Sequence, residues 1–341
     1  MAVHDLGYRG WTGRRMARAL RPWVVARSGV SLVWRRRWMR MTLLVAWLPI
    51  LAPALGIFLF ELSTTYPEMR PVLAELTRNF VPGNPELAAQ VLSDPEAARH
   101  EVWATLILAF FRYPQAVAMV LLVGLIAPMM ISYDLRSKAY LMYFSRPLTP
   151  MEYILGKSAV LWFFLSMIIT IPALVLYGVG VLLSSELSVI AQTWDIPLRI
   201  LAATIVLAVP TTALALCYSA FTSESRYATF TWFATWVMGS VAYRILTFAG
   251  QPFQPPRPRG GGPRWRQSAE AQEALQEWRN SIDYDKWRLL SPYDTLGKVQ
   301  SWVFGLDTTP ASVWPAVTVL VAITMACIWI IRNRIIARLS V

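Results

Sequence analysis

The sequence contains few charged residues, two histidines and two cysteines, and these shortages exclude several kinds of protein. Charged residues make up 15% of the 341 residues, whereas soluble domains usually contain roughly 25%. His4 and His100 stand far apart in the chain, so we do not expect them to share a metal ion. Cys217 and Cys327 fall within apolar runs, where cysteine behaves as a small hydrophobic residue. The sequence therefore predicts neither a metal site nor a disulfide.

The motifs of nucleotide-binding proteins and of membrane-embedded hydrolases are also missing. Gly156-Lys157-Ser158 has the form of the end of a phosphate-binding loop, G-x-x-x-x-G-K-[ST], but Met151 stands where the first glycine is required. No H-E-x-x-H or G-x-S-x-G stretch occurs. Residues 149–152, Thr-Pro-Met-Glu, instead have the form of a capping box that begins a helix. We expect a chain that is not an enzyme.

Long apolar runs dominate what is present. Hydrophobic residues make up 56% of the chain, and several runs reach the roughly 18 residues that mark a bilayer-spanning helix. A backbone that spans lipid must satisfy its own hydrogen bonds, so these runs are expected to be helical. The predicted fold is all-α, a polytopic membrane protein with six transmembrane helices. The predicted spans are 41–60, 111–131, 158–182, 198–218, 228–248 and 313–331.

The charge distribution predicts the orientation of these spans. Residues 1–40 carry ten arginines and one acidic residue, whereas 61–102 carry three arginines and seven acidic residues. Because positive charge concentrates on the cytoplasmic side, we expect a multi-pass protein of the cytoplasmic (inner) membrane with both termini in the cytoplasm. The net charge of +12 then favours anionic lipid, not nucleic acid. The predicted cytoplasmic segments are 1–40, 132–157, 219–227 and 332–341.

The segments outside the spans differ in character. Residues 22–41 predict an amphipathic interfacial helix, although a basic flank that only orients the first span is the alternative. The external segment 61–102 predicts short helices. The external loop 249–312 begins with a Pro/Gly/Arg stretch at 251–267 that has too little apolar content to fold, and a polar helix is expected near 269–280. The remainder of that loop mixes aromatic and charged residues, as a segment lying on the outer surface or dipping into it would.

The loop at 132–157 carries the most informative pattern. Its sequence from residue 133, YDLRSKAYLMYFSRPLTPMEYILGK, predicts two helical pieces around a turn at Arg146-Pro147. Tyr140, Tyr143 and Phe144 place exposed aromatic side chains before the turn, and such clusters often mark docking surfaces. A tight, capped turn without a partner is the alternative.

This loop and the six-span layout resemble the membrane permease subunits of type-2 ABC exporters. The matching residues are Asp134, Arg136, Ser137, Ser145, Arg146, Pro147, Leu148, Thr149, Glu152, Tyr153, Gly156 and Lys157. The resemblance implies that a separate ATP-binding cassette subunit binds ATP and Mg and hydrolyses the ATP. It also implies that two permease chains, as a homo- or heterodimer, form the export pathway.

The resemblance further assigns the loop as the contact with that ATPase. The matching residues, with Tyr140, Tyr143 and Phe144, would form an ATPase-coupling loop centred on 137–149, and Phe221, Glu224 and Arg226 would make a second cytoplasmic contact. The substrate stays open, and the long insertion at 251–267 departs from the pattern.

Two other functions are compatible with a polytopic chain. A secondary transporter or channel usually needs ionisable groups within the membrane, and a membrane-embedded enzyme needs paired acids or a nucleophile with a base. No predicted span carries an acidic residue or a histidine in its middle. Arg112 and Arg244 fall at the outer ends of spans, where each either reaches the headgroups or faces a substrate.

Overall fold

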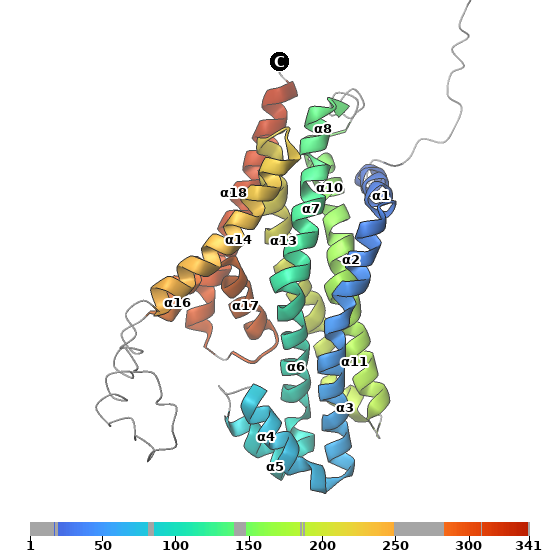
Figure 1. Ribbon diagram of the computed structural model, residues 1–341, viewed down its shortest axis with the longest axis vertical. Helices are drawn as coiled ribbons and strands as arrows, with labels where there is room; N and C mark the ends of the chain where they lie inside the picture. Colours follow the sequence, from blue (N-terminus) through green and yellow to red (C-terminus); the bar gives the residue numbers. More distant parts are fainter. Residues whose placement is uncertain are drawn as a thin grey trace, which may run out of the picture.

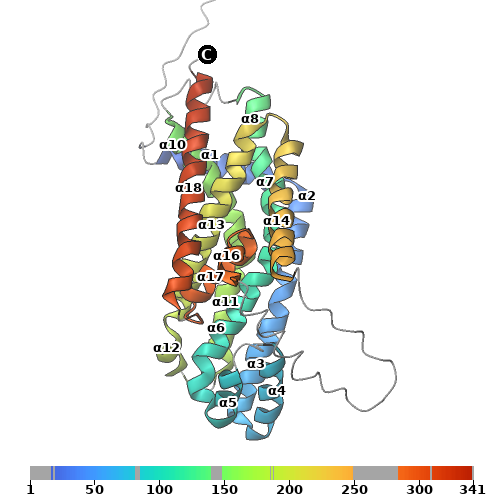
Figure 2. The ribbon, with the colours of Figure 1, turned by 90° about the vertical axis from the view of Figure 1, so that its left-hand side faces the viewer.

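The computed structural model describes residue 17 and residues 20–80, 85–139, 148–184, 186, 188–248, 283–307 and 309–339. Within these ranges the chain forms helices and no strand. Most of the long helices run along one axis (Figure 1). One end of the bundle carries α1, α8 and the last turns of α18, and we call it the loop end; the opposite end, with α4, α5 and α12, is the far end (Figures 1 and 2). The predicted flexible stretch at 251–267 and the helix near 269–280 lie outside the described residues.

Five helical stretches among the described residues are long and apolar enough to cross a membrane. They are Arg37–Thr65, Pro95–Arg136, Pro150–Leu183, Ser188–Phe221 and Pro310–Ala337. Several of these stretches are built from consecutive helices. The components are α2 (Arg37–Trp47) and α3 (Leu51–Thr65); α6 (Pro95–Pro114), α7 (Val120–Met130) and α8 (Ser132–Arg136); α10 (Pro150–Leu165) and α11 (Ile171–Leu183); α12 (Ser188–Thr193) and α13 (Ile196–Phe221); and α18 (Pro310–Leu339).

The joints within three of these stretches differ from regular α-helix. A 3-10 turn, η2 (Leu48–Ile50), joins α2 to α3. A π-helical turn, η4 (Gln115–Met119), joins α6 to α7, and a second one, η5 (Ser166–Thr170), joins α10 to α11. The two stretches that flank the 132–157 loop therefore each contain a π-helical turn, a feature found mostly as single-turn insertions within α-helices.

The predicted span at 228–248 lies in α14 (Ser225–Phe248), which is not among these five. Threonine, serine, tyrosine and tryptophan recur along it, and they lower its mean hydropathy. Its packing is nevertheless specific, because Trp232 donates to the Val120 carbonyl over 2.8 Å and Thr229 to the Gly124 carbonyl over 3.0 Å. The structure thus supplies five of the six expected spans by length and hydropathy, and the crossing at 228–248 stays a prediction.

At the loop end, α1 (Arg21–Trp34) runs across the bundle and is seen end-on in Figure 1. The predicted interfacial helix at 22–41 is therefore not one element: the chain turns at residues 35–36, and α2 begins the first long stretch at Arg37. α1 packs against α10. Its burial in a membrane interface stays a prediction.

At the far end, α4 (Arg70–Phe80) and α5 (Pro85–Ser93) pack together, as expected for short helices in 61–102 (Figure 1). A buried ion pair joins α3 to α6 beside them, with Arg99 Nε 3.2 Å from Glu61 Oε1. Trp103 Nε1 donates to the same carboxylate oxygen over 3.1 Å. The bonds from Arg99 and Trp103 compensate the cost of burying the Glu61 carboxylate.

The aromatic and charged segment after residue 283 folds back against the bundle. It forms α16 (Tyr284–Arg288) and α17 (Pro292–Val303), and α17 contacts α6, α13, α14 and α18. Ser291 caps α17 by accepting the Asp294 amide over 3.3 Å. Leu296 and Val299 are buried. The segment therefore packs between helices, and its position relative to the outer membrane surface stays a prediction.

The closeness of α1 to α10 depends on Gly156. A Cβ at this position would lie 2.7 Å from the Val25 Cβ and 2.9 Å from the Pro22 carbonyl oxygen. We predict that Gly156→Ala destabilises the protein by about 1–3 kcal/mol, because backbone must shift to admit the methyl group. The measurement is the thermal unfolding midpoint of the purified protein in detergent.

Gly178→Ala is the matched control, because a Cβ there meets no atom within 4 Å. This variant should unfold at the wild-type temperature or slightly above it, since alanine favours helix over glycine. Equal midpoints for the two variants would show that α1 does not depend on the Gly156 contact.

Candidate functional site

Three buried polar side chains join the two helices that flank the 132–157 loop. Lys157 Nζ of α10 lies 2.7 Å from Asp134 Oδ2 of α8. The Tyr153 hydroxyl donates to the same oxygen over 2.7 Å. The side chains of Lys157 and Asp134 are 6% and 9% exposed. Bonds to an ionised group are the stronger ones, so these residues, the Asp134 cluster, hold the start and the end of the loop together.

Local helix geometry arranges the donors of the Asp134 cluster. Tyr153 and Lys157 are four residues apart and so share one face of α10. Gly156 faces α1 instead. The Gly-Lys-Ser tripeptide is thus accounted for by packing at its glycine and by an ion pair at its lysine, not by a phosphate.

The capping box at the start of α10 is confirmed. The Glu152 amide donates to Thr149 Oγ1 over 3.3 Å, and the Thr149 amide donates to Glu152 Oε2 over 2.7 Å. Pro150 occupies the first helical turn, where its missing N–H costs nothing. Leu148, directly before the cap, is half-buried against the core. The C-terminal arm of the loop is therefore anchored where α10 begins.

The two predicted cytoplasmic contacts lie beside each other. Arg136 Nη1 is 3.8 Å from Glu224 Oε2, and Arg226 Nη2 is 3.7 Å from the same oxygen. The Arg334 guanidinium of α18 lies 4.5 Å from the Phe221 ring centroid. Arg136 and Arg226 are 68% and 78% exposed, so these ion pairs contribute at most about 1 kcal/mol each. These ion pairs contribute little stability, but they show that residues 136, 224 and 226 lie together on one exposed surface.

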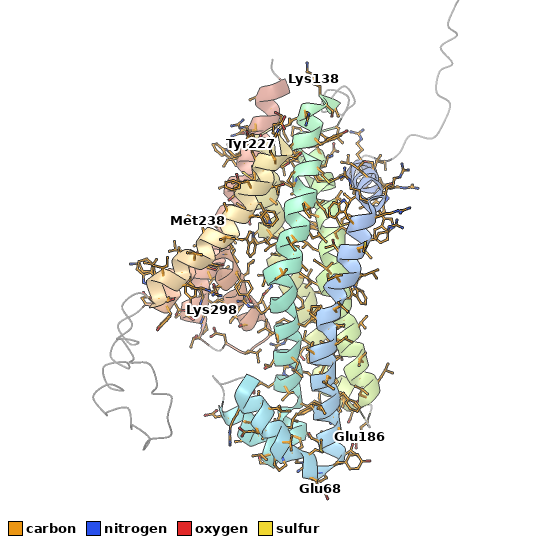
Figure 3. The ribbon with its side chains drawn as sticks, in the orientation of Figure 1. Glu68, Lys138, Glu186, Tyr227, Met238 and Lys298 are labelled. Atoms are coloured by element: carbon orange, nitrogen blue, oxygen red, sulfur yellow. The ribbon has the colours of Figure 1, made fainter. Side chains whose placement is uncertain are left out.

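The N-terminal arm of the loop begins with α8, which ends at Arg136. The Ser137 hydroxyl donates to the Tyr133 carbonyl over 2.9 Å. Lys138 has a φ of 56°, the left-handed conformation that often terminates a helix. Figure 3 shows Lys138 at the loop end, opposite Glu68 and Glu186 at the far end. Residues 140–147 of the predicted coupling loop lie outside the described residues, and they include six of the predicted contact residues: Tyr140, Tyr143, Phe144, Ser145, Arg146 and Pro147.

Sequence reasoning missed a second connection at the loop end. The Ser132 amide donates to Ser219 Oγ over 2.9 Å, and the Ser132 hydroxyl donates to the Ser219 carbonyl over 2.9 Å. Both serines are fully buried. They tie α8 to the last turn of α13, but two serines 87 residues apart carry no pairing signal in a single sequence.

The two cysteines do not belong to the Asp134 cluster. Cys217 and Cys327 are buried free thiols on α13 and α18. Over the part of the chain that the structure describes, no group of three or more His, Cys, Asp and Glu side chains is arranged to hold a metal ion.

Comparison with known proteins decides the family. A family model described as ABC-2 family transporter protein matches residues 35–332. The chain belongs to this family. It is a membrane permease component of an ABC transporter. The match includes the Asp134 cluster, four of the five long apolar stretches in full and the fifth stretch as far as residue 332. A search of curated proteins finds no match to this ABC-2 permease.

Removing one partner of the buried ion pair should destabilise this ABC-2 permease more than removing both. We predict that Lys157→Met costs about 3–5 kcal/mol, because the Asp134 carboxylate then stays buried without its ammonium partner. Asp134→Asn combined with Lys157→Met should recover more than half of that loss. Thermal unfolding of the single and double variants gives the coupling.

Arg136→Gln serves as the exposed control and should change stability by less than about 1 kcal/mol. If the effects of the Asp134 and Lys157 substitutions simply add, the two side chains are not coupled and the cluster does not hold the loop.

Proposed function

We propose that this ABC-2 permease forms the translocation pathway of an ABC exporter and is driven by a separate ATPase subunit that contacts the 132–157 loop. The observation that supports this most directly is the Asp134 cluster, because it joins both arms of the loop at their bases. Because α8 and α10 are joined in this way, a displacement of the loop by a partner acts on both helices together. An unanchored loop would absorb the same displacement by bending.

The contacts around the loop define what would move with it. α8 continues from α7, and it is bonded to α13 through Ser132 and Ser219 and to α10 through Asp134. Displacing the loop would therefore shift α7, α10 and α13 together. ATP can bias such a shift only by binding the two states differently, and in our proposal the ATPase subunit supplies that difference.

The remaining components are the ATPase subunit and a second permease chain. ATP and Mg belong to the partner subunit, and this chain carries no cofactor of its own. A second permease chain, identical or different, completes the pathway. Only 22% of the most apolar part of α18 and 28% of that of Arg37–Thr65 are buried within the chain. Most of the surface of these two stretches therefore faces lipid or a second permease. In this proposal the loop end faces the cytoplasm at the inner membrane, and both termini are cytoplasmic.

This orientation predicts which introduced cysteines react from which side. In intact cells a membrane-impermeant maleimide should label Glu68→Cys and Glu186→Cys but not Lys138→Cys, and inside-out vesicles should give the reverse. The native Cys217 and Cys327 are 4% and 6% exposed, so they should contribute little background.

The same labelling tests whether α14 crosses the membrane. Tyr227→Cys should react from the cytoplasmic side and Asp283→Cys from the outside. Reaction of both from one side would leave five spans, and a reversed pattern at Lys138 and Glu68 would reject the orientation and the coupling role of the loop.

The ATPase partner can be tested by co-purification. When the permease is expressed with a candidate ATP-binding cassette subunit from the same organism, the two should purify together. Arg146→Glu and Tyr143→Ala should each reduce the recovered ATPase about tenfold or more, as expected for central interface residues.

Matched substitutions at the far end are the controls. Arg78 and Tyr66 are exposed there, so Arg78→Glu and Tyr66→Ala repeat the chemistry of the loop variants without altering the loop. They should leave the complex intact. A permease that purifies alone and is fully active would contradict the proposed division between the two subunits.

A further inference from the structure

A charged cavity of about 510 Å³ lies between α6 and the α16–α17 pair. Its volume falls in the range of small-molecule sites, roughly 300–1,000 Å³. Glu101 and Arg112, both on α6, form one side of it, and Asp294 and Lys298 of α17 form the other. Arg288 and Asp307 complete the charged lining, which therefore contains three cationic and three anionic side chains.

In the orientation proposed above, on which this step rests, the cavity lies near the level of the far membrane surface. Arg112 precedes Met130, at the end of α7, by 18 residues, a rise of about 27 Å at 1.5 Å per residue. That length approaches the roughly 30 Å hydrocarbon thickness of a bilayer. Glu101 lies three helical turns farther out on α6. The cavity thus extends from headgroup level towards the water beyond it.

Arg112 is held in a fixed position at the inner end of the cavity. Its Nη1 donates to the Tyr293 carbonyl over 2.6 Å, and its guanidinium lies 3.6 Å from the Tyr293 ring centroid. Nη2 is 3.6 Å from Asp294 Oδ1. A side chain at Gly297 would overlap the guanidinium. These contacts therefore hold the Arg112 guanidinium in one orientation, with its positive charge at the cavity wall.

The outer end of the cavity holds a second ion pair. Lys298 Nζ lies 2.6 Å from Asp307 Oδ2, and the two side chains are 13% and 17% exposed. Burial acts to raise the pKa of Asp307, but hydrogen bonds from Lys298 and Thr309 outweigh it and lower that pKa below its ordinary value. Asp307 is thus anionic at neutral pH, and both signs of charge face the cavity together.

We propose that this cavity binds a zwitterion, a ligand that carries an ammonium group and a phosphate or carboxylate. The balance of charges carries the inference, because an ion of one sign would face as many repulsive as attractive side chains. Arg112, Arg288 and Lys298 receive the anionic group, and Glu101, Asp294 and Asp307 receive the ammonium. The ligand is either a zwitterionic headgroup of the adjoining leaflet or a soluble zwitterion from outside.

The test uses the purified full-length chain in detergent, without an ATPase, so it is independent of the proposed coupling. Native mass spectrometry measures binding of phosphatidylethanolamine and of phosphatidylglycerol, and calorimetry measures binding of soluble glycerophosphoethanolamine, a phosphodiester with one ammonium group. We expect saturable binding of at least one of the two zwitterionic probes. Glu101→Gln and Lys298→Gln should each weaken it about tenfold or more, as loss of a charge-assisted bond does.

Lys286→Gln is the matched control, because it removes the same charge from an exposed position of α16 outside the cavity lining. Its affinity should stay within about twofold of wild type. Glu101→Gln keeps the test decisive if Lys298→Gln disturbs the α16–α17 pair, since Glu101 belongs to α6; thermal unfolding reports on folding in each case.

The pattern of binding identifies the source of the ligand. Preference for phosphatidylethanolamine supports a lipid headgroup, and binding of glycerophosphoethanolamine alone supports a soluble ligand. Tighter binding of phosphatidylglycerol than of either zwitterion overturns the inference. Absence of any saturable binding, or zwitterion binding that Glu101→Gln leaves unchanged, overturns it as well.

Discussion

The ion pair between Lys157 and Asp134 sets the geometry of the whole loop end. Two opposite charges that are largely excluded from water can be stable only in close contact and with further hydrogen bonds, and here Tyr153 supplies one of them. The pair therefore fixes α8 against α10. Gly156, the residue before Lys157, fixes α1 on the same helix. Serine contacts then extend the frame to α13.

Polar contacts of this kind have more influence on helix arrangement in a membrane than in water. Lipid tails are as apolar as leucine, so burying leucine between spans gives little drive for association, and close packing and interhelical hydrogen bonds decide which helices pair. The bundle follows this rule at both ends. Asp134 with Lys157 joins the helices at the loop end, and Glu61 with Arg99 joins α3 to α6 at the far end. Between them the buried residues are mainly apolar.

Sequence reasoning succeeded where the determining interactions are local. The capping box at Thr149 involves residues three apart, and the long apolar stretches follow from composition, so both could be predicted. The Asp134–Lys157 pair could not, because periodicity does not tell which distant helices meet. The crossing at 228–248 stays a prediction, because the hydroxyl and aromatic residues of α14 lower its mean hydropathy. The inward packing of α17 depends on Arg112, which is 181 residues from its carbonyl partner.

The two π-helical turns have a consequence for how related chains should be aligned. A π turn holds one residue more than an α turn, and that residue rotates everything after it by about 100° about the helix axis. Within Pro95–Arg136, Arg112 faces the cavity and Ser132 faces α13. Because η4 lies between them, the extra residue in η4 sets the angle about the helix axis between these two side chains. A relative lacking a single residue at 115–119 could keep Ser132 against Ser219 or Arg112 against Gly297, but not both.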